Sequence, residues 1–129
     1  MIRRSLGDLE LSEAGGRSAA DPFPGLDPAH GVEVRVVEVT KQTRQPHLHP
    51  KSAEVIHVLE GEGKHWQAVT GRGGEWTGLA PGDVVLVPAD TAHVSLASPG
   101  SKLRLLCFFP DPDLPRNIEE LPQEISLPD

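Results

Sequence analysis

Three histidines and one glutamate of this chain have the types and the spacing of ligands to a single metal ion. His47 and His49 are two residues apart, Glu54 follows five residues later, and His93 lies much further along the chain. In a β-strand, residues i and i+2 face the same side with Cβ atoms about 7 Å apart, so the two imidazoles of such a pair can reach one ion. Imidazole and carboxylate donors suit several divalent transition metals. The pattern therefore predicts a metal site built on strands.

Glu54 is supported by a second argument, which comes from its neighbours. It shares its strand parity with Ile56 and Val58, so it is predicted to point toward a hydrophobic core. A carboxylate is costly there unless a cation compensates its charge. Besides serving as a ligand, Glu54 could carry a proton in a metal-assisted reaction. His93 shares its parity with Ser95, whose small side chain leaves room for a second molecule beside the metal.

These side chains must be positioned by short strands. The 13 glycines and 13 prolines favour many turns. Strands are expected over residues 32–40, 53–60, 64–69, 84–87, 93–97 and 103–109. The parity of the valines slips within 32–40, which predicts a bulge, and the unbroken apolar run 84–87 predicts a strand covered on both faces. Several short strands with turns between them indicate a closed barrel or a sandwich.

Composition narrows the class of protein. A chain of 129 residues suits one domain. The net charge of −7, from 12 basic and 19 acidic residues, disfavours nucleic acid and anionic membrane surfaces as partners, but it allows a small anionic substrate at a bound cation. The sequence holds no apolar stretch long enough for a transmembrane helix, and its single cysteine, Cys107, excludes an intrachain disulfide. We therefore expect a cytoplasmic protein.

The two segments that hold the predicted ligands resemble the two motifs of the cupin superfamily. The first reads PHLHPKSAEVIHVLEG and ends at Gly61. The second reads GDVVLVPADTAH, beginning at Gly82 and ending at His93. Two positions depart from the pattern, since Asp90 stands where many members have glycine and Ala97 where many have asparagine. Neither position is a metal ligand in the superfamily, so the resemblance still implies an intact site.

The resemblance implies an all-β, single-domain cupin β-barrel, also called a double-stranded β-helix or jelly roll. This barrel is expected over residues 32–109. Residues 1–31 would then form an N-terminal arm that could supply an edge or dimerisation strand. Residues 110–129 would form a proline-rich acidic tail, either docked on the barrel or mobile.

The resemblance also implies one divalent metal ion, with Fe(II), Mn(II), Ni(II) and Zn(II) all open as its identity. The implied ligands are His47, His49, Glu54 and His93. Four ligands leave one or two positions of an octahedral ion open to water, substrate or O₂. His65 and Gln67 share a parity on the strand after the first motif, and with Ser95 they are candidate pocket-lining residues.

The function implied is metal-assisted chemistry on a small oxygenated organic molecule, with a dioxygenase-type reaction as the first choice. Isomerases, lyases and cyclases occur on the same barrel, and so do modules that bind or sense a metabolite without converting it. The expected partners are therefore a small molecule and a second copy of the chain. For a homodimer, Leu9, Leu11 and the outer face of residues 32–39 could supply the interface.

Overall fold

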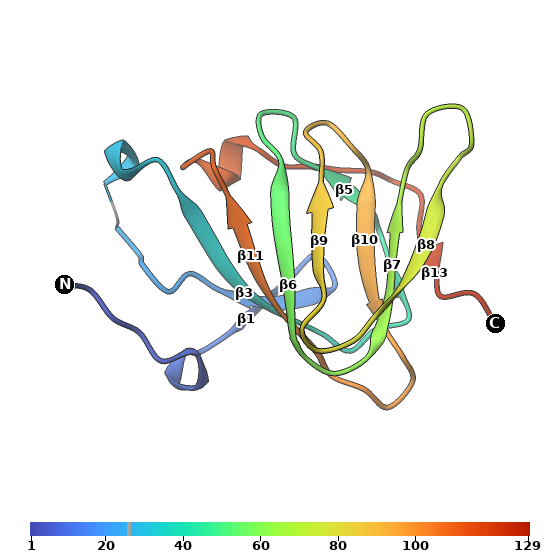
Figure 1. Cartoon of the computed structure of the whole chain (residues 1–129), viewed down its shortest axis with the longest axis horizontal. Helices are drawn as coiled ribbons and strands as arrows, with labels where there is room; N and C mark the ends of the chain where they lie inside the picture. The colour runs from blue at the N-terminus through green and yellow to red at the C-terminus, as the bar shows by residue number, and fades with distance from the viewer. Residues whose placement is uncertain (26) are drawn as a thin grey trace.

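The computed structural model describes residues 1–25 and 27–129 and consists mainly of strands arranged in two facing sheets (Figure 1). The strands are β1 (Ser12–Ala14), β2 (Arg17–Ala20), β3 (Glu33–Val39), β4 (Thr43–Arg44), β5 (His47–Leu48), β6 (Glu54–Glu60), β7 (Gly63–Gln67), β8 (Glu75–Leu79), β9 (Val84–Val87), β10 (His93–Ala97), β11 (Leu103–Phe109), β12 (Glu119–Glu120) and β13 (Ile125–Ser126). The helical segments of the described residues are single 3-10 turns, at Leu6–Asp8, Pro28–His30 and Leu114–Arg116. Within that part of the chain, no helix has the length and apolarity needed to cross a membrane.

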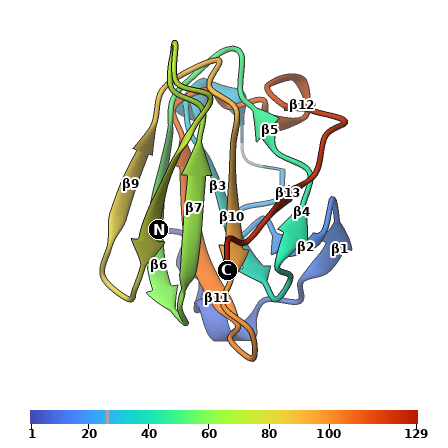
Figure 2. The ribbon, with the colours of Figure 1, turned by 90° about the vertical axis from the view of Figure 1, so that its right-hand side faces the viewer.

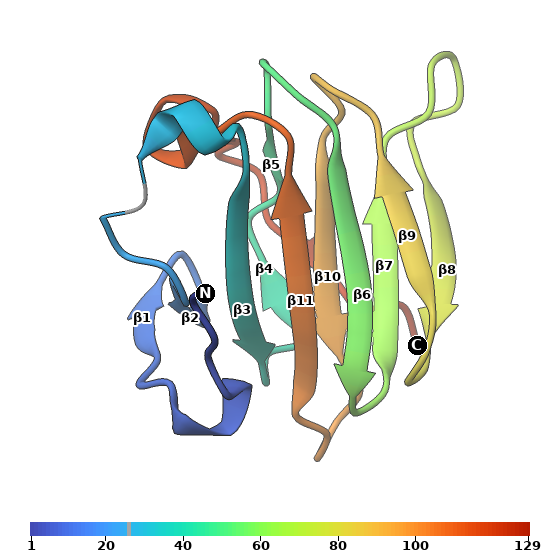
Figure 3. The same ribbon diagram turned by 60° about the vertical axis from the view of Figure 1, so that its left-hand side comes forward.

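The strands pair in the order β1-β2-β3-β11-β6-β9 in the larger sheet and β12-β5-β10-β7-β8 in the smaller one. A short ribbon, β13-β4, continues the second layer. All pairs are antiparallel, and Figure 3 shows β3, β11, β6 and β9 side by side in the larger sheet. The predicted all-β, single-domain jelly-roll barrel is confirmed.

The core lies between the sheets and follows the period of two expected of half-buried strands. Ile56 and Val58 of β6 point inward, as do Leu105 and Cys107 of β11. Glu54 shares their parity and is 4% exposed, so the carboxylate lies in the core layer as its sequence parity predicts. The complete core cluster is Val37, Val39, Ile56, Val58, Leu79, Val87, Ala97, Leu103, Leu105, Cys107 and Phe109.

The prediction that residues 84–87 are covered on both faces is wrong. Val84 and Leu86 of β9 are 65% and 63% exposed, while Val87 is 1% exposed. The run is continuous because the outward positions are apolar as well as the inward ones. Val84 and Leu86 therefore face outward from β9, which is also the last strand of its sheet. An apolar run by itself therefore did not distinguish a buried strand from an edge strand with an apolar outer surface.

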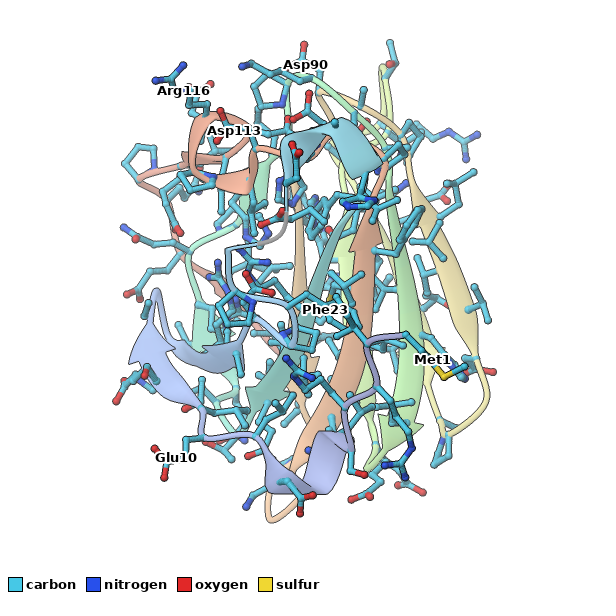
Figure 4. All side chains as sticks on the ribbon, turned by 90° about the vertical axis from the view of Figure 1, so that its left-hand side faces the viewer. Met1, Glu10, Phe23, Asp90, Asp113 and Arg116 are labelled. Carbon is cyan, nitrogen blue, oxygen red and sulfur yellow. The ribbon has the colours of Figure 1, made fainter. Side chains whose placement is uncertain are left out.

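The prediction of a bulge in the first strand is also wrong. β3 pairs with β11 in unbroken register, and the one register shift of β11 lies between Arg104 and Leu105 on its β6 side. Val36 and Val37 are both buried because each of the two faces of β3 is covered. On the outer face Arg104 Nη2 donates to the carbonyl of Leu6 at 2.7 Å, which ties the N-terminal segment across this sheet (Figure 4).

Both chain ends add strands to the barrel. The β1–β2 hairpin pairs with β3 at the edge of the larger sheet, slightly later in the chain than the leucines at positions 9 and 11 suggested. In the C-terminal tail β12 pairs with β5 and β13 pairs with β4 (Figure 2). Asn117, just before β12, is fully buried. The tail is thus docked, and it lies directly against the strand that carries the histidine pair.

Candidate metal centre

The four predicted ligands come together inside the barrel. His47 begins β5, His49 follows it, Glu54 begins β6 and His93 begins β10, where it pairs directly with His47. One donor atom from each of the four lies within 4.8 Å of all the others. All four side chains are buried. The direct pairing of His93 with His47 brings the second motif against the first and explains the cluster.

The donor atoms converge on a common point. Glu54 Oε1 lies 2.8 Å from His93 Nε2 and 3.1 Å from His49 Nε2. The second contact is too poorly aligned to be a hydrogen bond, so His49 Nε2 is a buried nitrogen without a partner. The imidazole centroids of His47 lie 4.5 Å from His93 and 5.0 Å from His49. A buried cation would satisfy these donors, so the residues fit the divalent metal ion that the motifs imply.

Two backbone carbonyls orient the imidazoles. His49 Nδ1 donates to the carbonyl of Asn117 at 2.7 Å, and His93 Nδ1 donates to the carbonyl of Thr91 at 2.9 Å. Because a carbonyl only accepts, Nδ1 carries the proton in both residues and Nε2 presents its lone pair to the cluster. His47 Nδ1 is buried without a partner. The sequence did not indicate that Asn117 orients His49, because the two residues are 68 positions apart in the chain.

The electrostatics of the cluster favour the protonation states that metal ligands need. Burial lowers the pKa of His47 well below its ordinary value, with His93 and Arg17 acting in the same direction. A neutral imidazole and an ionised carboxylate bind a divalent ion without first losing protons.

Two cavities adjoin the cluster, of about 150 Å³ and about 40 Å³. Both are lined by Arg17, Val37, His47, Glu54 and Cys107. Arg44, His93 and Ser95 line the smaller one, and His49 and Phe109 the larger one. Together they leave room for a small molecule beside the ligands.

Arg17, Arg44 and Cys107 are among the cavity residues that were not singled out for the site from the sequence. Arg17 and Arg44 carried no sequence signal, because arginine on a short strand normally indicates a surface position. Cys107 lies in the core at 4% exposure. Burial raises the pKa of its thiol well above the usual value, and the nearby Glu54 adds to that effect. The thiol therefore stays protonated beside the cluster.

The three candidate pocket residues occupy different places. Ser95 lines the smaller cavity directly. His65 is 2% exposed, with its ring centroid 5.9 Å from that of His93. Its imidazole contacts Ser95 Oγ at 3.0 Å and Gln67 Oε1 at 3.1 Å. Gln67 and His65 also line a separate hollow of about 210 Å³ near Trp76, on the β7–β8 side.

Sequence comparison agrees with this architecture. A family model described as "Cupin domain" matches residues 34–109, more than half of the chain. The chain belongs to the cupin family. Comparison of this cupin with curated proteins found no match.

Solved structures share the fold of this cupin. Oxalate decarboxylase from Lactobacillus farciminis, in a formate complex, has a TM-score of 0.67 and 23% identity, covering 95% of this chain and 34% of that chain. Oxalate oxidase with the substrate analogue glycolate has a TM-score of 0.75 and 18% identity, covering 92% and 62%. A variant of Streptomyces Pac13 with uridine has a TM-score of 0.72 and 15% identity, covering 95% and 92%. The cupin thus spans about a third of the decarboxylase and almost all of Pac13.

The position where this cupin has aspartate in place of the common glycine takes a left-handed conformation. Asp90 has φ of 60°, a region that aspartate tolerates better than most residues. Its amide donates to the carbonyl of His49 at 2.8 Å, which joins the second motif to the first. Figure 4 places Asp90 at the same end of the barrel as Asp113 and Arg116, which flank the docked start of the tail. The departure from glycine therefore does not prevent the hydrogen bond that holds this loop beside the ligands.

Proposed function

We propose that this cupin binds one divalent metal ion on His47, His49, Glu54 and His93, and that it uses the ion to act on a small oxygenated organic molecule. The observation that carries the proposal is the buried convergence of four donors, one of them the partnerless His49 Nε2. An ionised carboxylate aimed at two imidazole lone pairs is costly in a core, and a bound cation removes that cost.

Each residue has a defined part in this proposal. His49 and His93 are held in the tautomer that offers Nε2, through the carbonyls that accept from Nδ1. Glu54 supplies the single negative charge of the ligand set, and it could also relay a proton to a substrate in the adjoining cavities. A divalent ion there would polarise a carbonyl or carboxylate oxygen of the substrate, and a redox-active ion would also support oxidation by O₂.

A dioxygenase-type reaction is the first to test. The solved structures with this fold are described as an oxalate decarboxylase in a formate complex, an oxalate oxidase with glycolate and, for Pac13, a nucleoside dehydratase. They support a small oxygen-bearing substrate, while their reactions differ from one another. Isomerase, lyase or cyclase chemistry and simple binding of a metabolite are therefore the alternative outcomes of the test.

The test begins with metal analysis of protein purified without added metal. One equivalent of a divalent ion is expected in the wild type and in the control His30→Ala, since His30 is exposed and is not one of the clustered residues. The double variant His49→Ala with Glu54→Ala is expected to lose it. Stoichiometric metal in the double variant would contradict the assignment. An O₂-uptake screen then separates the reactions, because Fe(II) with O₂ consumption supports a dioxygenase.

We also propose that the protein is a homodimer that covers an apolar patch on its larger sheet. Leu86 and Phe108 lie in one row across β9, β6 and β11, and Val84 lies in the next row of β9. Among the described residues they are the most exposed large apolar side chains after Met1 and Ile2, with Phe108 at 38%. Contiguous apolar surface of this kind commonly marks an interface. The outer face of β3 is less suited to this, since Val36 is fully buried within the chain.

A further inference from the structure

Arg44 is a buried cation with unused hydrogen-bond donors. Its side chain is 4% exposed, and Nη1 donates to the carbonyl of Ser95 at 2.7 Å. Nε and Nη2 are buried and have no partner. In the described part of the chain no carboxylate forms an ion pair with this guanidinium. Burial, followed by the charge of Arg17, lowers its pKa from 12.5 to about 10.

The two unused nitrogens are neighbours on the guanidinium plane. Nε–H and the adjacent Nη2–H form one edge of the fork, which is the edge that holds both oxygens of a carboxylate in bidentate pairs. The one hydrogen bond of Arg44 uses the other terminal nitrogen. The protein thus fixes the guanidinium through Ser95 and leaves both nitrogens of this edge buried without a hydrogen-bond partner.

Arg44 belongs to the wall of the smaller cavity, together with His47, Glu54 and His93. The β1–β2 hairpin packs on its stem and beside Nε, since a Cβ at Gly16 would lie 3.2 Å from Arg44 Cγ and 3.6 Å from Nε. The same hairpin places Arg17 in the walls of both cavities. A second guanidinium therefore lies beside the cluster.

Arg17 is held only loosely. Its Nη1 lies 3.8 Å from Glu120 and 3.5 Å from the carbonyl of Gly15, both long for a hydrogen bond. Its side chain is 18% exposed. Such a side chain can turn toward a new anionic partner at little energetic cost.

The charges around the cavities do not balance. In the smaller cavity two arginines and a divalent ion would face one lining carboxylate, that of Glu54, while Glu120 lies 3.8 Å from Arg17 outside the lining. Arg35, a third arginine that lines the larger cavity, is paired with Asp21 and Glu33. Charges removed from water are stable only when they are paired, so this cavity strongly favours a negatively charged occupant.

We propose that the substrate of the metal site is a small carboxylate anion and that Arg44, assisted by Arg17, binds its carboxylate. The inference rests on the metal-dependent function proposed above and names the substrate class of that site. A carboxylate matches the free edge of Arg44 in shape and charge, and its size suits cavities of about 40 and 150 Å³. A neutral molecule would leave the buried cation uncompensated.

The test compares glycolate with its neutral analogue glycolamide by calorimetric titration of the Zn(II)-loaded protein. Wild type is expected to bind glycolate and to bind glycolamide far more weakly. Arg44→Met keeps the length of the side chain and removes the charged fork, so glycolate affinity is expected to fall about 10- to 100-fold. The control Arg72→Met removes an exposed arginine paired with Glu75 and is expected to change nothing.

Two further measurements separate substrate binding from a structural role. Metal content of Arg44→Met is expected to equal that of wild type, and its stability without anion is expected not to fall, because the substitution removes an uncompensated buried charge. If Arg44→Met does not fold, Arg44→Lys keeps the charge, loses the bidentate edge and is expected to bind glycolate several-fold more weakly.

Each outcome has a defined meaning. Unchanged glycolate affinity in the Arg44 variants, or equal affinity of wild type for glycolamide, overturns the inference while the metal site stands. Phosphate binding more tightly than glycolate overturns the assignment to carboxylates. If wild type binds no metal, the proposed function fails instead. The metal-free protein then decides the arginine site, since a rise of its melting temperature in glycolate that Arg44→Met abolishes supports the site, and no rise overturns it.

Discussion

Replacing His65 with glutamine is expected to make the stability of the protein less sensitive to acid. His65 is 2% exposed, and its Nε2 lies 3.1 Å from Gln67 Oε1, which can only accept. Nε2 therefore carries the proton, and Nδ1 accepts from Ser95 Oγ at 3.0 Å. Burial lowers the pKa of His65 from 6.5 to about 4, against the opposing effect of Gln67. The folded protein thus keeps this imidazole neutral where the unfolded chain would protonate it.

The sign and size of the effect follow from linkage. Between the two pKa values the unfolded state binds a proton that the folded state does not, so stability falls as the pH decreases through this window. The full difference corresponds to roughly 3 kcal/mol, and about 2 kcal/mol of it is lost between about pH 7 and about pH 5. Glutamine does not titrate, and its amide can still donate to Gln67. The loss over the same interval is therefore expected to be about 2 kcal/mol smaller in His65→Gln.

The assay is urea denaturation of the metal-free protein at both pH values, followed by tryptophan fluorescence. Metal-free protein is used because release of a bound ion in acid would add its own pH dependence. The other histidines and carboxylates are common to both proteins and cancel in the difference. Equal losses of stability in wild type and His65→Gln would refute the reasoning, since a solvated His65 would contribute no such linkage.

Three further predictions concern the backbone, the tail and the assembly. Gly61→Ala is expected to lower the free energy of unfolding by more than about 3 kcal/mol, because Gly61 has φ of 83° and a Cβ there would lie 2.1 Å from a backbone carbonyl oxygen. Gly71 has φ of 80° with open space around it, so the control Gly71→Ala is expected to lower that free energy by only about 1 kcal/mol, as measured by thermal unfolding. Asn117→Ala removes the partly buried hydrogen bonds that its side chain makes to the loop after β5, so it is expected to lower the free energy of unfolding by about 1–3 kcal/mol, with the exposed Gln123→Ala as control. Leu86→Lys is expected to shift the protein from dimer to monomer in analytical ultracentrifugation without lowering its metal content, and a wild type that is already monomeric would contradict the interface.

The sequence by itself determined the barrel class and the identity of the four clustered residues. Alternation with a period of two encodes which side chains share a face, so the parity of Glu54 with Ile56 and Val58 already placed a carboxylate in the core layer. The turns that end each strand are likewise encoded locally, by glycine and proline. The parity and the turns depend on residues close together in the chain, whereas His93 was identified by the second motif, and the structure brings all four residues together.

Only the tertiary structure decided which distant residues support the site and which apolar surfaces remain open. Asn117 orients His49 from the tail, and Arg44 is buried because the N-terminal hairpin packs over it. Val84 and Leu86 belong to an unbroken apolar run yet face outward at the edge of a sheet. Strand order and the paths of the two chain ends determine these contacts and exposures, and neither can be predicted from the local pattern of residues.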